Sequence, residues 1–465
     1  WDNGLKAAVS PFLAGDVKKS QHAFLTPPAA RYDLWAARAT RNVWVRVNGK
    51  RTWSAVGRDT EEEMPELKVR AGFLYHRIVS RRSAGRKRAI EVRVTDFVPP
   101  DERSFCTLVT ATNTGHKSAS VELAYCAYLY GRDAENLRDH RHVTSLLNET
   151  WAENGGAYLR PRITFDERGH RYNETTYAVV GRDERNRKPA RVVLSLEEWL
   201  GARLNPDAPA GLFGGARPAT RLDGDEAVAA LEFAAVTLEP GESSTVAVWH
   251  AIGDRRELLS AGRKLRYRDV PQAFERTRAA WRKRLAVPVF RTGDARFNSW
   301  IRWVALQPHL RKITGNSFLP DFDYGKGSRG WRDLWQDALN LIVTDPAEAR
   351  RLILNNWKGL RLDGTNATII GEKPGEFLAD RNNIVRVWMD HGTWPVFTTL
   401  RYLHATGDFG ILAEGATYFR DGMRERGRRF LPGTGATQEL DAKGRPYCGL
   451  LVEHMLLALV TASHD

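Results

Sequence analysis

The side chains with the clearest chemical potential lie in a glycine-rich stretch that runs into a predicted helix. The start of that helix reads Gly-Trp-Arg-Asp-Leu-Trp-Gln-Asp and ends at Asp337. Arg332 and Gln336 are four residues apart, as are Asp333 and Asp337, so each pair shares one face of the helix. Such groups bind sugar hydroxyls, and Trp331 is of the type that covers the apolar face of a pyranose ring. On residue types alone, a capping cluster with internal ion pairs is an equal alternative.

A second polar and aromatic cluster lies downstream, in residues 380–383 and 388–395. It reads Asp-Arg-Asn-Asn and then Trp-Met-Asp-His-Gly-Thr-Trp-Pro. Polar groups at a helix start are costly to bury unless they line a polar cavity, so Asp390 and His391 are candidate sugar ligands. His391 has no second His or Cys nearby, which argues against a metal site and leaves a structural histidine as the alternative. Residues 363–368, between the two clusters, are a weaker signal of the same kind.

The chain is strongly basic. The 465 residues carry a formal net charge of +14, which suggests nucleic-acid binding. The arginines are dispersed, however, and usually lie close to acidic residues. The densest basic stretch, residues 81–88, lies between two strand-like segments and is better explained as a solvated hairpin tip. We therefore expect no nucleic-acid partner, although a basic surface suits an enzyme that handles phosphate and sugar phosphates.

Other function classes are disfavoured by the motifs that the sequence does not contain. It has no G-x-S-x-G motif, no P-loop and no dinucleotide-binding fingerprint. No apolar run approaches the roughly 20 residues that cross a bilayer, so we expect no membrane partner. The cysteines Cys106, Cys126 and Cys448 have neither zinc nor disulfide spacing, and no signal peptide is visible. We therefore expect a cytoplasmic protein without a metal ion.

The first half of the chain has the pattern of antiparallel strands. In residues 43–47, valines alternate with Trp44 and Arg46, and Asn48-Gly49, the signature of a type I′ hairpin turn, follows. Further short strands are predicted at 90–94, 106–112, 121–130, 228–238 and 244–252, with turn residues between them. Repeated short strands with no periodic helix between them predict a sandwich.

The pattern changes near Arg255, where helical periodicity begins. Helices are predicted at 257–268, 272–285, 296–311, 347–360, 393–405 and 450–461. Asp345-Pro346 is a good cap and first-turn pair, and Gly407 is a good helix end. Strands followed by helices indicate two domains, of which the second is all-α.

Several segments together resemble the family of inverting cellobiose, chitobiose and laminaribiose phosphorylases, which is related to cyclic β-1,2-glucan synthase modules. They are residues 15–18, 130–145, 330–337, 388–395 and 407–408. The likeness extends over essentially the whole chain. It implies an α+β multidomain protein: an N-terminal antiparallel β-sandwich at 1–254, a helical linker at 255–290, and the first half of an (α/α)6 barrel at 291–465.

The resemblance also implies a reaction. In that family an acid protonates the glycosidic oxygen, and inorganic phosphate, the co-substrate, attacks the anomeric carbon from the opposite face. Phosphate is already anionic and needs positioning more than a base, unlike the water of an inverting hydrolase. The resemblance assigns Arg332 and Asp337 to the hydroxyls of the cleaved sugar, with Trp331, Asp333 and Gln336 beside them. Asp390 and His391 carry over less directly, and no organic cofactor is implied.

The chain departs from the family at the catalytic acid. The family's general acid lies in an Asp-Trp-Asn-Asp run of a later barrel loop, and this sequence has no such run. The catalytic residue is therefore unknown here. We expect the remaining half of the barrel in cis or as another chain, a homodimer as the assembly, and uncovered apolar helix faces in these residues alone.

Three functions are compatible with the sequence. The first is phosphorolysis and reverse synthesis of a β-linked gluco-disaccharide or oligosaccharide. The second is a transglycosylase or hydrolase acting on β-glucans, which would lack phosphate ligands or carry a second carboxylate. The third, from another class, is a noncatalytic carbohydrate-binding or scaffold protein. The glycosidic linkage and the acceptor sugar have no signal in the sequence.

Overall fold

The protein is described here by a computed structural model. The structure describes residues 4–20, 22–28, 40–59, 66–85, 87–137, 140–166, 169–214, 218–286, 289–314, 330–367, 369–370, 374–379, 390–420 and 437–464. These residues form two compact units that divide between Arg284 and Leu285. The sequence clusters at 321–329 and 380–389 lie outside the described residues.

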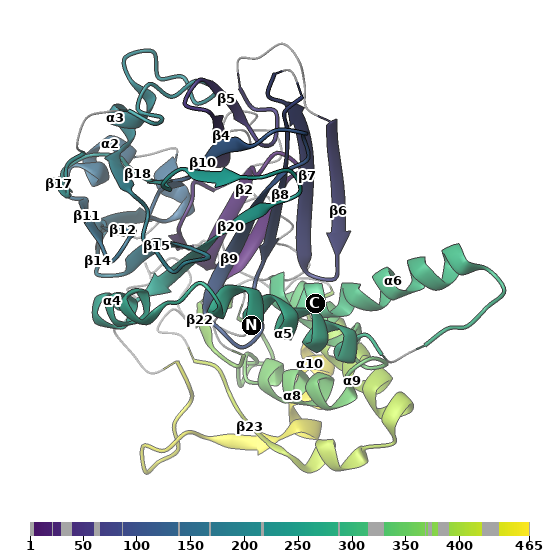
Figure 1. Ribbon diagram of the computed structural model, residues 1–465. Coiled ribbons are helices and arrows are strands. Elements are labelled where there is room, and N and C mark those ends of the chain that lie inside the picture. Colours follow the sequence, from purple (N-terminus) through teal and green to yellow (C-terminus); the bar gives the residue numbers. More distant parts are fainter. Residues whose placement is uncertain are drawn as a thin grey trace. The chain divides into compact units, whose positions relative to one another are not determined.

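Two large antiparallel sheets form the first unit (Figure 1). The larger has the order β17 (Arg221–Asp223), β11 (Glu149–Glu153), β12 (Gly156–Arg160), β15 (Thr176–Asp183), β20 (Ser243–Gly253), β9 (Ser104–Asn113), β8 (Ala89–Phe97), β7 (Tyr75–Ser83) and β6 (Glu66–Gly72). The second has the order β16 (Arg191–Ser195), β18 (Ala227–Glu232), β10 (Ala119–Leu129), β4 (Arg41–Val47) and β5 (Arg51–Ser54), and β19 (Val236–Leu238) also pairs with β10.

Smaller elements complete this unit. They are β1 (Lys6–Val9), β2 (Gly15–Ser20) and β3 (Ala23–Phe24) in one sheet, β13 (Arg162–Asp166) and β14 (Gly169–Asn173) in a hairpin, and the short helices η1 (Ala134–Leu137), α2 (Arg141–Ser145) and α3 (Leu196–Leu200).

The core of the sandwich follows from the alternation of apolar residues along its strands. Val92 and Val94 of β8, Val45 of β4 and Val248 of β20 are all buried in one cluster that draws on both large sheets. In a strand, residues two apart point to the same face, so each sheet contributes every second side chain to the core. The predicted antiparallel sandwich is confirmed.

The hairpin predicted at residues 43–54 is also confirmed. β4 pairs with β5 from Trp44↔Ser54 to Val47↔Arg51. Between them, Asn48 has φ 54 and Gly49 has φ 65. A type I′ turn needs positive φ at both central residues, and Asn and Gly are the residues that tolerate it best.

The turn between β9 and β10 and the turn between β19 and β20 do not close hairpins. β9 lies in the larger sheet and β10, which follows it, in the second sheet. Likewise β19 lies in the second sheet and β20 in the larger one. The chain crosses the sandwich at both turns, because each of these strands finds its partner in another part of the sequence.

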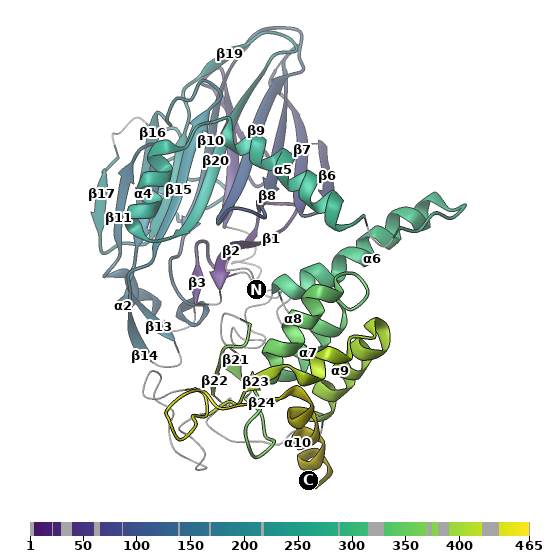
Figure 2. The same cartoon turned by 90° about the horizontal axis from the view of Figure 1, so that it is seen from below.

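Two helices pack on one face of the larger sheet in the same unit (Figure 2). α4 (Arg255–Lys264) begins after Asp254, whose carboxylate accepts hydrogen bonds from the amides of Arg256 and Glu257. Its Leu258 packs with aromatic and apolar side chains of β11, β12, β15 and β20. α5 (Asp269–Arg284) packs Phe274 against β8, β9 and β20. Both helices fall in the predicted linker segment.

The second unit contains the remaining helices. They are α6 (Ala295–Thr314), α7 (Trp331–Leu339), α8 (Pro346–Trp357), α9 (Thr393–Thr406), η5 (Phe409–Ala413) and α10 (Leu451–His464), with the small strands β21 (Ile369–Ile370), β22 (Phe377–Ala379), β23 (Gly415–Thr417) and β24 (Cys448–Leu450). Trp335 and Trp357 are fully buried at the centre of its core. Helices following the sandwich are thus confirmed, and their arrangement as half of a barrel stays a prediction.

None of the helices in the described ranges is long and apolar enough to cross a membrane.

Candidate functional site

The first predicted cluster is positioned by α7. Its buried face consists of Trp331, Leu334, Trp335, Asp337 and Ala338, which alternate at helical spacing with more exposed residues. Gly330 caps the helix without a side-chain hydrogen bond. The first turn of the helix carries Arg332, which is exposed, and Asp333, which is half-buried, at the edge of the core.

Hydrogen bonds join the two sequence clusters in space. The indole Nε1 of Trp331 donates to the backbone carbonyl of His391 over 3.0 Å, across 60 residues of sequence. At the next residue of the helix, Nη1 of Arg332 lies 3.0 Å from Oδ2 of Asp390, across 58 residues. The start of α7 thus meets the turn that precedes α9, where the backbone carbonyl of Asp390 accepts from the amide of Trp394.

The ion pair between Arg332 and Asp390 is open to solvent, with side chains 52% and 42% exposed. Partial burial would raise the pKa of Asp390, but the hydrogen bond and charge of Arg332 bring it below the ordinary value. An exposed pair of this kind contributes little to stability, typically below about 1 kcal/mol. Both groups can therefore exchange the ion pair for hydrogen bonds to an incoming hydroxyl.

His391 is held uncharged beside this pair. Burial lowers its pKa to about 4, against the charge of Asp390, which raises it, and with that of Arg332, which lowers it further. Its Nδ1 lies 3.4 Å from the side-chain amide of Asn366. A neutral imidazole offers one donor and one acceptor, as a sugar ligand requires. Asn366 belongs to the segment that carried only a weak sequence signal.

The remaining predicted residues differ in their access to solvent. Asp333 and Gln336 are half-buried. Asp337 and Trp331 are each 1% exposed, and the Trp331 ring packs against Trp335 with 5.7 Å between ring centroids. In the described arrangement neither side chain offers a surface to a sugar. Their roles as sugar ligands stay predictions.

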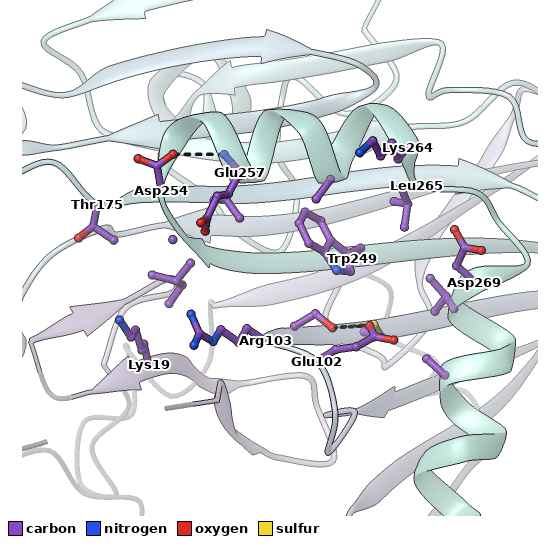
Figure 3. A pocket seen from close by; sticks show the side chains of 18 of the residues that line it. Lys19, Glu102, Arg103, Thr175, Trp249, Asp254, Glu257, Lys264, Leu265 and Asp269 are labelled. Atoms are coloured by element: carbon purple, nitrogen blue, oxygen red, sulfur yellow. Dashed lines mark hydrogen bonds between the residues drawn. The ribbon is translucent and has the colours of Figure 1, made fainter. Parts of the chain in front are cut away.

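The sandwich unit contains a cavity that the sequence did not suggest (Figure 3). Its volume is about 830 Å³, and it lies beside the indole of Trp249 on β20. Charged residues of both signs line it: Lys19, Glu102, Arg103, Glu174, Asp254, Glu257, Lys264 and Asp269. An aromatic ring surrounded by carboxylates and cations suits a polyhydroxylated ligand. The sequence did not mark Trp249 as a candidate ligand-binding residue, because it lies within a strand, among other apolar residues.

No group of three metal-binding side chains occurs within the described part of the chain.

Comparison with protein families identifies the first unit. The family described as glycosyl hydrolase 94, supersandwich domain, matches residues 31–268, half of the chain. A curated relative, the cyclic beta-(1,2)-glucan synthase NdvB of Rhizobium meliloti (strain 1021), is 28% identical over 239 residues. The match covers 50% of this chain and 8% of that protein, so the chain spans a small part of the relative's length.

Among solved structures, a putative kojibiose phosphorylase from the human microbiome has 10% identity and a TM-score of 0.45, with 88% of this chain and 55% of that one covered. A bacterial glucoamylase complexed with acarbose has 11% identity and a TM-score of 0.48, with 86% and 55% covered.

Proposed function

Since the chain belongs to the glycosyl hydrolase 94 family, we propose that it is part of an enzyme that cleaves β-linked gluco-oligosaccharides with inorganic phosphate. The product is α-glucose 1-phosphate, formed with inversion at the anomeric carbon. In the second unit, the observation that supports the proposal is the solvent-exposed pair of Arg332 and Asp390 beside the neutral His391. Phosphate is the co-substrate, and no cofactor is proposed.

In this reaction the bond between the anomeric carbon and the glycosidic oxygen breaks as a carboxylic acid protonates that oxygen. A phosphate oxygen forms the new bond from the opposite face. The residues of this chain orient the sugar: Arg332 donates to its hydroxyls, and Asp390 accepts from them. We place the general acid outside residues 1–465, because the family's Asp-Trp-Asn-Asp run is not in this sequence.

The apolar surface of the second unit supports the proposal that further helices complete a barrel. Trp300 of α6 is 57% exposed, Leu400 of α9 is 42% exposed and Leu456 of α10 is 58% exposed. Large exposed apolar side chains on several helices are typical of a surface that another element covers. The covering half is in cis or on another chain, and the assembly is a homodimer, which light scattering of the complete enzyme would test.

The reaction is tested by its dependence on phosphate. The enzyme with its complete barrel is incubated with β-1,2-, β-1,3- and β-1,4-linked glucose disaccharides, with and without phosphate. We expect glucose 1-phosphate from at least one disaccharide, and no cleavage without phosphate. Cleavage that releases free glucose without phosphate indicates a hydrolase, and transfer between glucans indicates a transglycosylase; either result contradicts the proposal.

The cavity beside Trp249 favours a second function, noncatalytic carbohydrate binding by the sandwich unit. The test is calorimetric titration of β-gluco-oligosaccharides into the full chain and into Trp249→Ala and Glu257→Gln. Glu257 is exposed on α4, so its substitution leaves the core unchanged. Binding that weakens in both variants and persists in Trp300→Ala supports this function. Equal affinity in all four proteins contradicts it.

A further inference from the structure

One buried carboxylate on the sandwich unit is surrounded by four arginines. Glu149, the first residue of β11, is 3% exposed. Its Oε2 accepts from Nη2 of Arg160 at 2.6 Å and from Nη2 of Arg162 at 3.1 Å. Its Oε1 lies 3.2 Å from Nη2 of Arg221 and 3.6 Å from Nη1 of Arg255. Four cations from four separate elements thus converge on one anion.

The sheet itself sets this arrangement. Glu149 pairs directly with Arg160 on β12 and with Asp223 on the edge strand β17. Two carboxylates directly opposite each other repel. Arg221 lies between them, because its Nε is 3.4 Å from Asp223 while its Nη2 reaches Glu149.

The other arginines are held by different means. The Arg255 guanidinium lies 4.5 Å from the centroid of the Trp151 ring, which fixes it as a cation–π partner. Arg162 adopts φ 59, a left-handed conformation that is uncommon for a residue with a side chain. Backbone strain of this kind is more frequent at binding sites than elsewhere.

The cluster has donors and charge left over. A carboxylate accepts about four hydrogen bonds, whereas four guanidiniums offer about twenty N–H donors. The four arginines, Glu149 and Asp223 sum to a net charge of +2, from four positive and two negative groups. The arginine side chains are 26–57% exposed, so their outer donors reach solvent.

We propose that these four arginines form a binding site for a phosphate dianion, either inorganic phosphate or the phosphate group of a sugar phosphate. The planar fork of a guanidinium matches two phosphate oxygens, and the charge of a dianion balances that of the cluster. Glu149 holds the arginines together in the absence of the ligand. The inference does not depend on the phosphorolytic activity, because it rests on this cluster alone.

The test is calorimetric titration of inorganic phosphate and of glucose 1-phosphate into the full chain in roughly 0.15 M chloride, where exposed charges are largely screened. Glucose is the neutral control ligand. The binding variant is Arg162→Gln with Arg221→Gln, which removes the two most exposed guanidiniums, at 50% and 57%. The matched control is Arg263→Gln, an arginine of α4 that is 72% exposed and lies outside the cluster.

We expect both phosphate ligands to bind, glucose not to bind, and affinity to fall about tenfold or more in the double variant but not in the control. If circular dichroism shows that the double variant does not fold, the two single variants are titrated in its place. Equal affinities for the two phosphate ligands mean that the site reads the phosphate alone, and tighter binding of glucose 1-phosphate means that it also contacts the sugar. The proposal is overturned if phosphate does not bind, or if binding is lost in Arg332→Ala and kept in the double variant.

Discussion

At the scale of single side chains, the second unit brings a guanidinium and a carboxylate together across 58 residues of sequence and leaves both in contact with solvent. Such a pair is a poor source of stability and a good source of hydrogen bonds for a ligand. Asp337, by contrast, is buried, so its carboxylate bears on the stability of the fold. A carboxylate in the interior stabilises or destabilises the fold according to its partners, whereas an exposed pair chiefly affects binding.

Replacing Arg332 by Ala in the complete enzyme should therefore lower kcat/KM by about 100-fold or more, because donors aligned with the substrate are lost. The free energy of unfolding should change by less than about 1 kcal/mol. Steady-state kinetics and urea unfolding measure the two effects. Arg445→Ala is the control, since Arg445 forms an exposed pair with Asp441 in the same unit. Unchanged kinetics would remove Arg332 from the site.

The pH dependence of the free energy of unfolding should reveal the contribution of the Glu149 carboxylate to stability. Burial acts to raise its pKa, but hydrogen bonds from Arg160 and Arg162 bring the pKa below the ordinary value. A carboxyl with a lowered folded pKa stabilises the fold above its unfolded pKa, and this stabilisation is lost as pH falls through the folded value. Glu149→Gln should cost about 2 kcal/mol at pH 7.

Urea unfolding of the wild type and of Glu149→Gln at pH 7 and at about pH 3, below the ordinary carboxyl pKa, checks this sign. The difference between the two proteins should shrink at the lower pH. Glu257→Gln, an exposed substitution on α4, should differ from the wild type by no more than about 0.5 kcal/mol. A difference for Glu149→Gln that is equal at both pH values would contradict the explanation.

At the scale of helices and strands, the ends of elements follow local rules that can be tested one residue at a time. Gly407 ends α9 with φ 69, and a methyl group added there would meet no atom within 4 Å. Gly407→Ala should thus cost about 1 kcal/mol from backbone conformation alone. Gly415, which has equal space and no positive φ, is the control and should tolerate Ala. Equal losses in the two variants, measured by thermal unfolding, would show that the positive φ of Gly407 is not the cause of its loss.

The same local rules decide how much could be predicted from the sequence. Asn48-Gly49, the Asp345 cap of α8 and the Gly407 end were recognisable because each acts within a few residues. The crossings between sheets were not, because alternation tells which side chains face the core and not which sheet a strand joins. The meeting of Arg332 with Asp390 was likewise not predictable from spacing, since no periodicity connects residues 58 apart.

At the scale of the whole molecule, the hydrophobic clusters of the sandwich, α4 and α5 are composed of residues 5–274, all within the first unit. A segment that closes its own cores can fold alone. Residues 1–284 expressed without the rest should give a cooperative thermal transition and dispersed NMR signals. A fragment that aggregates or unfolds gradually would show that the sandwich needs the second unit.

The position of β20 in the larger sheet also bears on synthesis at the ribosome. This strand, at residues 243–253, lies between β15 and β9. It therefore joins two groups of strands that are both made before it: β6 to β9 on one side, and β11, β12, β15 and β17 on the other. Until it emerges from the exit tunnel, the nascent chain holds two partial sheets with unpaired edges. Such edges attract other chains, so a pause before residue 253 leaves the nascent chain open to wrong pairing.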